Sequence, residues 1–94
     1  MKQSDKFKLN KKIGNYCRHF RKECLHLTLK EMAERTGITA PNFSQFENGF
    51  NGQQHYIYHY MLATDNEGLR LGFNQSLTKL ISHNDYNYTW LDSH

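Results

Sequence analysis

The chain has 94 residues and a formal net charge of +3, a length that suffices for one domain with a modest core and not for two. No apolar run approaches the roughly 20 residues that a membrane-spanning helix needs, and no apolar signal core follows the basic N-terminus. We therefore expect no membrane partner, no secretory signal and a cytoplasmic location.

The charge is distributed unequally along the chain. Residues 1–22 hold eight basic residues and one acidic residue, a charge of +7, whereas the remainder carries −4. A basic block at one end is a common form of phosphate-contacting arm, although a solubilising tail has the same composition. We assign residues 1–8 to a basic arm and expect Lys8, Lys11 and Lys12 to contact phosphates.

From about Leu9 the spacing of apolar residues predicts a first helix. Its apolar stripe consists of Leu9, Ile13, Tyr16, Cys17, Phe20 and Cys24. Cys17 and Cys24 are two turns apart, about 10 Å along a helix, which is too far for a disulfide. We expect both to be reduced thiols that pack in the core.

Residues 28–36 predict a short second helix that ends in a tight turn. Thr28 and Glu31 have the spacing of a capping box, in which each side chain bonds the other residue's amide. Gly37 follows the last helical residue, where a left-handed conformation ends the helix and glycine avoids the steric cost.

A third helix is predicted over residues 40–48. Thr39 is placed as its N-cap, and Pro41 lies in the first turn, where a missing amide costs little. Phe43 and Phe46 are three apart and would face the second helix, and Asn48-Gly49 would close the helix. The polar side chains left on the outer face, which suit the reading of base edges, are Asn42, Ser44, Gln45 and Asn48.

The segments TLKEMA, TGIT and QFENG together resemble the helix-turn-helix of the lambda-repressor/Cro-like (XRE) family of bacterial and phage regulators. The resemblance covers about residues 13–63. It implies an all-α, compact bundle of about five helices, with residues 9–64 as the helix-turn-helix DNA-binding core. An ordinary helical hairpin in an unrelated bundle is the alternative.

The resemblance also implies a set of DNA contacts. Glu47 would form an ion pair that fixes the third helix and does not itself touch bases. Its partner is Arg21 or Lys22, and both remain candidates because the ECLHLT segment between the first two helices is one residue longer than is usual in the family. Besides Lys8, Lys11 and Lys12, the expected DNA-binding residues are Thr39, Ala40, Pro41, Asn42, Ser44, Gln45 and Asn48.

After the third helix, FNGQQ is a polar loop without lysine or arginine. Phe50 is interpreted as a staple for the next helix in preference to a wedge between bases. HYIYHYMLA predicts a fourth helix with Ile57, Tyr60 and Met61 inward. His55 and His59 are one turn apart, but no third ligand lies at a recognisable spacing, so no metal and no cofactor are expected.

Asp65 or Asn66 is expected to cap the last helix, and Gly72 is a point where that helix could divide. Its apolar stripe is Leu69, Phe73, Leu77, Leu80 and Ile81, and the tail that follows is rich in aromatic residues. Terminal aromatics often mark an interface, although they can also pack onto the first helix. We assign residues 65–94 to a C-terminal helix and aromatic tail that forms a dimerisation region.

No glycine-rich phosphate loop, nucleophile–base set or ligand cluster is recognisable, so we do not expect an enzyme. The favoured function is a sequence-specific regulator that binds double-stranded DNA. As the resemblance implies, it would be a homodimeric repressor of a phage or mobile element, bound to a palindromic operator. The alternative is a small interaction module that keeps the helix-turn-helix fold but binds a protein partner.

Overall fold

The computed structural model describes residues 3–50 and 55–82. In these ranges the chain is an all-α bundle, and no strand occurs in them. The five α-helices are α1 (Gln3–His19), α2 (Leu29–Thr36), α3 (Ala40–Glu47), α4 (His55–Leu62) and α5 (Glu67–Ser82), and a short π-helix, η1 (Phe20–Cys24), follows α1. The predicted compact all-α bundle of about five helices is confirmed.

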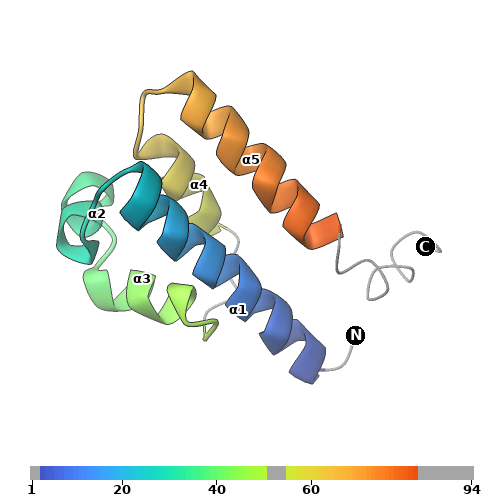
Figure 1. The fold of residues 1–94 in the computed structure, drawn as a ribbon. Coiled ribbons are helices and arrows are strands. Elements are labelled where there is room, and N and C mark those ends of the chain that lie inside the picture. The colour runs from blue at the N-terminus through green and yellow to red at the C-terminus, as the bar shows by residue number, and fades with distance from the viewer. Residues whose placement is uncertain (1–2, 51–54, 83–94) are drawn as a thin grey trace.

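The two long helices, α1 and α5, run side by side in opposite directions, and α3 packs on the other side of α1 (Figure 1). Tyr16 of α1 stacks on Phe73 of α5 with ring centroids 5.5 Å apart. None of the described helices combines the length and the apolar character that crossing a membrane requires.

The first helix begins at Gln3, six residues before the expected start at Leu9. Residues 3–12 contain neither glycine nor proline and include several lysines, which have good helix propensity. The backbone of the basic segment therefore continues the helix.

The π-helix η1 explains the extra residue in the link after α1. The Leu25 amide donates to the Phe20 carbonyl at 3.0 Å, a bond between residues five apart. A single π turn holds one more residue than an α turn without disturbing the helix before it. The chain then turns at His26, whose φ is +56°.

The predicted ends of α2 are confirmed. The Thr28 hydroxyl accepts from the Glu31 amide at 3.1 Å, and the Glu31 carboxylate accepts from the Thr28 amide at 2.9 Å. Hydrogen bonding of the Glu31 carboxylate to Thr28, first to its backbone amide and then to its side chain, lowers the pKa of Glu31. Gly37 ends the helix with φ of +80°.

Helix α3 differs from expectation at its N-cap. Thr39 occupies the cap position and Pro41 lies in the first turn, as predicted, but the Thr39 side chain makes no capping hydrogen bond. Its backbone carbonyl instead accepts from the amides of Asn42 and Phe43.

Helices α4 and α5 close the core. Tyr60 is buried as expected, whereas Ile57 and Met61 are half-buried. Asn66 caps α5, since its side-chain oxygen accepts from the Leu69 amide at 3.0 Å. Helix α5 continues through Gly72 without a break. The aromatic tail lies in 83–94, outside the described residues.

The buried core draws on every helix. Both cysteines are free thiols, as predicted, and Cys17 is fully buried whereas Cys24 is half-buried. Burial raises the pKa of the Cys17 thiol, and the negative charge of Glu47 adds to this shift. The buried apolar residues are Ile13, Cys17, Phe20, Leu27, Met32, Phe43, Phe46, Tyr56, Tyr60, Ala63, Phe73 and Leu77.

Candidate nucleic-acid interface

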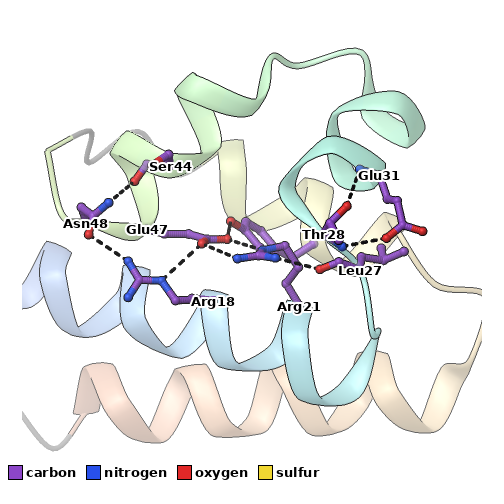
Figure 2. Close-up of polar contacts among 9 residues, drawn as sticks. Arg18, Arg21, Leu27, Thr28, Glu31, Ser44, Glu47 and Asn48 are labelled. Carbon is purple, nitrogen blue, oxygen red and sulfur yellow. Dashed lines mark hydrogen bonds and ion pairs between the residues drawn. The ribbon is translucent and has the colours of Figure 1, made fainter.

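Helix α3 is attached to α1 and its π-helical extension through the buried carboxylate of Glu47. The guanidinium of Arg21 donates to both carboxylate oxygens, from Nε to Oε2 at 2.8 Å and from Nη2 to Oε1 at 2.9 Å (Figure 2). Arg21 Nη1 also donates to the Leu27 carbonyl at 2.7 Å. The cation left open by the sequence is therefore Arg21, and Lys22 is exposed.

A buried carboxylate is stable only when its charge is compensated by hydrogen bonds and counter-charges. Glu47 is 1% exposed, and the Tyr60 hydroxyl donates to its Oε2 at 2.7 Å. Arg18 adds a weaker ion pair at 3.5 Å. Burial is the main reason that the pKa of Tyr60 is raised, and the charge of Glu47 contributes to it. These partners fix the C-terminal end of α3 relative to α1, η1 and α4.

Two glycines allow α1 and α3 to pack at backbone distance. A Cβ atom on Gly14 would lie 2.4 Å from the Phe46 carbonyl oxygen. A Cβ atom on Gly49, whose φ is +86°, would lie 2.9 Å from Lys11 Cα. The end of α3 is therefore held by direct backbone contact in addition to the ion pair.

The seven predicted contact residues on and around α3 lie together on one short segment. Ala40 and Ser44 are half-buried, whereas the exposed members are Thr39, Pro41, Asn42, Gln45 and Asn48. Because Glu47 is buried, the exposed face of α3 carries no carboxylate.

The polar side chains on this face differ in their availability. Within the described part of the chain, Asn42 and Gln45 make no side-chain hydrogen bond. Asn48, by contrast, donates to the Ser44 carbonyl at 2.8 Å and accepts from Arg18 Nη2 at 2.8 Å (Figure 2). Asn42 and Gln45 are thus the amides available to a ligand, and Asn48 instead orients Arg18.

The predicted lysines of α1 lie on different sides of that helix. Lys8, Lys11 and Lys12 are all exposed, but successive residues of a helix are rotated by 100°. Lys11 lies beside the end of α3 through its contact with Gly49. Lys12 is rotated toward Tyr16, which stacks on α5. The structure therefore brings Lys11 next to α3 and places Lys12 nearer to α5.

Three residues of this region were not predicted from the sequence, namely Gly14, Arg18 and Tyr60 in its role as a donor to Glu47. Gly14 could have been identified from the sequence, because a glycine in a helix interior lowers helix stability by about 1 kcal/mol relative to alanine and so suggests a close packing contact. Arg18 is one turn before the candidate pair Arg21 and Lys22, which places it on a similar side of α1.

Among the described residues, the two histidines of α4 do not belong to a larger ligand set. The rings of His55 and His59 have centroids 6.3 Å apart. Across residues 3–50 and 55–82, no three histidine, cysteine or acidic side chains are grouped so that they could hold a metal ion.

Comparison of the chain with protein-family models, with curated proteins and with solved structures found no match.

Proposed function

We propose that this protein is a sequence-specific transcriptional regulator that binds double-stranded DNA and reads the major groove with α3. One observation carries the proposal. The side chains of Asn42 and Gln45 are exposed on α3 and have no hydrogen-bond partner in the described chain, and the buried Arg21–Glu47 pair fixes this helix in place.

The chemistry of the exposed face suits the edges of bases. Glutamine and asparagine can each form two hydrogen bonds to adenine in the major groove, and small apolar groups contact the thymine methyl. Gln45 and Asn42 supply the amides, and Ala40 and Pro41 supply the apolar surface. Because α3 is already fixed in the free protein, binding to DNA should cost little of its conformational entropy.

Electrostatic attraction would come from α1. Phe50 lies three residues beyond the end of α3, and the FNGQQ segment that it begins contains no lysine or arginine. Lys11 lies beside the end of α3, and Arg18 reaches it through Asn48. These cations, with Lys8, are suited to contact the phosphates that border the groove.

A single eight-residue helix reads only a few base pairs. Regulators of this kind pair two such helices one DNA turn, about 34 Å, apart, which requires a symmetric dimer and a palindromic operator. We therefore propose a homodimeric repressor. Its assignment to a phage or mobile element in a bacterial cytoplasm is based on the family resemblance of residues 13–63.

The direct test is a mobility-shift assay with DNA from upstream of the protein's own gene, at low salt and with random-sequence duplex as competitor. We expect a complex that survives an excess of competitor, because specific binding usually exceeds non-specific binding by at least about 1,000-fold. If neither duplex is bound at low salt, the proposal is wrong.

A protein partner is the second candidate, and the outer face of α4 favours it. Tyr58 and Leu62 are one turn apart and remain 59% and 50% exposed. Exposed apolar groups that adjoin one another often mark interaction sites. If this candidate were correct, Tyr58→Ser with Leu62→Ser should abolish the biological effect of the protein without altering its melting temperature, and Gln45→Ala should leave that effect unchanged.

A further inference from the structure

Phe50 is the most exposed large apolar side chain in the described part of the chain, and it lies three residues beyond the end of the proposed reading helix. It is 74% exposed, whereas the other exposed large apolar side chains are 40–59% exposed. Its backbone is nevertheless fixed. The Phe50 amide donates to the Gln45 carbonyl at 2.9 Å, and the Gly49 amide donates to the Phe46 carbonyl at 3.0 Å. These are the two hydrogen bonds of a Schellman motif.

The usual apolar partner of a residue in this position is missing. In a Schellman motif the residue after the left-handed glycine commonly packs on the side chain five or six residues before it. Those residues are Gln45 and Ser44, which are both polar. The ring of Phe50 instead lies beside Phe7 of α1, with centroids 5.8 Å apart and planes at 45°. Phe7 is itself 40% exposed, so the Phe7–Phe50 pair is left largely in water.

Positive charge surrounds the Phe7–Phe50 pair. Lys8 follows Phe7 directly, and Lys11 is one turn further along, rotated by about 40°. The backbone of Lys11 touches Gly49, the neighbour of Phe50. The only acidic residue in positions 1–22 is Asp5. An aromatic pair with flanking ammonium groups is complementary to a polyanion that also offers apolar rings.

The geometry points to the Phe7–Phe50 pair as a backbone contact for duplex DNA, an inference that rests on the proposed function. The two rings pack on the deoxyribose of the strand that borders the groove read by α3, and Lys8 and Lys11 neutralise the adjacent phosphates. When the first residues of a reading helix contact base edges, its C-terminal end turns toward the groove edge, where the sugar–phosphate backbone runs. The Phe7–Phe50 pair lies at that end.

A sugar contact and a phosphate contact have different signatures. An apolar contact to deoxyribose carries no sequence information and releases no counterions. Loss of the ring should therefore weaken binding to any duplex without altering the dependence of log affinity on log salt concentration. Loss of a phosphate-contacting lysine should lower the slope of that dependence by about 0.9.

The experiment compares Phe50→Ala with Leu71→Ala on the full chain. Leu71 is a matched control, because it is 58% exposed on α5 and lies outside the apolar stripe of that helix. The probes are a random-sequence duplex and DNA from upstream of the protein's own gene, each titrated at several salt concentrations. We expect Phe50→Ala to bind both duplexes about tenfold more weakly with an unchanged salt slope. Lys11→Ala should lower the slope, and Leu71→Ala should bind as the wild type does.

Each contrary result has a separate meaning. If the wild type binds neither duplex, the proposed function itself fails. If the wild type binds and Phe50→Ala matches Leu71→Ala, the sugar contact is refuted, and the Phe7–Phe50 pair is left for a protein partner. A loss confined to the upstream duplex would show that the ring reads bases, which also overturns the inference. Phe7→Ala gives the same comparison if Phe50→Ala lowers the melting temperature.

Discussion

Gly14 lies where α1 meets the C-terminal end of α3. Any side chain there would collide with backbone, since a Cβ atom would be 2.4 Å from the Phe46 carbonyl oxygen and 2.5 Å from that of Glu47. A backbone carbonyl inside a helix cannot move aside as a flexible side chain can. The close approach of the two helices, and with it the Arg21–Glu47 pair, therefore depends on this one glycine.

We expect Gly14→Ala to lower the free energy of unfolding by about 1–3 kcal/mol, as overpacked core sites do. Gly72→Ala is the matched control, because Gly72 also lies within a helix and a Cβ atom there meets nothing within 4 Å. That control should raise stability by about 0.5–1 kcal/mol. Urea unfolding followed by circular dichroism measures both changes. Equal effects of the two substitutions would contradict the close contact at Gly14.

Two buried ionisable groups, a thiol and a phenol, should make the free energy of unfolding fall at high pH. Burial raises the pKa of the Cys17 thiol and of the Tyr60 phenol, and the charge of Glu47 adds to both shifts. Their ordinary pKa values are 9.0 and 10.0. Above these values the unfolded chain has released protons that the folded chain retains, so stability is complete below about pH 9 and falls as the pH rises.

The expected decline is up to about 1.4 kcal/mol per pH unit for each group. Urea midpoints measured at intervals from neutral pH to about pH 11 would test it. Tyr60→Phe should make the decline shallower, because a phenyl ring cannot ionise. A free energy of unfolding that stays constant above about pH 10 would rule out this coupling.

Among the elements, η1 accommodates one extra residue in the segment that connects α1 to α2. Phe20 and Arg21 begin the π turn and are both buried, whereas Lys22 and Glu23 are exposed. The Leu25 amide bonds the Phe20 carbonyl five residues back. Removal of one exposed residue within this turn would bring that amide four residues after Phe20, which is the α-helical spacing.

Deletion of Lys22 should therefore be tolerated, with a change in the free energy of unfolding of no more than about 1 kcal/mol. Deletion of Asn15, an exposed residue in the regular part of α1, is the control. It should abolish folding, because it rotates all later residues of α1 by about 100° and displaces Cys17 and Phe20 from the core. Thermal unfolding measures both variants, and a Lys22 deletion as harmful as the Asn15 deletion would refute the role of η1.

Helix α3 supplies the prediction on sequence reading. Gln45→Ala should weaken binding to the specific site by about 1–3 kcal/mol and leave binding to random DNA nearly unchanged. The reason is that the Gln45 side chain is exposed and has no partner among the described residues, so its truncation should not disturb the fold. Competition mobility-shift assays measure the two affinities. An equal loss on both duplexes would exclude Gln45 as a base-reading residue.

At the scale of the whole molecule, the buried apolar residues of the described chain lie between Ile13 and Leu77. All five helices contribute to this core. If the aromatic tail forms the proposed dimer interface, a chain ending at residue 83 should remain helical, sediment as a monomer and lose affinity for the operator. Loss of helicity would assign the tail to the core.

A truncated chain that still sediments as a dimer would place the interface elsewhere. The outer face of α4 is then the next surface to test, because Tyr58 and Leu62 remain exposed there. Analytical ultracentrifugation of the truncated chain with Tyr58→Ser would decide between the two surfaces.

The local features of the fold could be predicted from the amino-acid sequence. The capping box of Thr28 and Glu31, the left-handed Gly37 and the inward pair Phe43 and Phe46 were all predicted. Each depends on residues at most four positions apart, whose interactions follow from helical geometry and turn chemistry. The outward placement of Asn42 and Gln45 follows from the same periodicity. The Thr39 side chain is the local exception, since it occupies the cap position without making the hydrogen bond.

Which groups anchor α3 depends on contacts between helices that are far apart in the sequence. Arg21 and Glu47 are 26 residues apart, and the choice of Arg21 over Lys22 depends on how η1 orients the chain after α1. The same holds for Gly14, for Arg18 at Asn48 and for the Tyr60 hydroxyl at Glu47. These contacts are set by the distance and angle at which helices cross, which is a property of the assembled core and not of any short segment.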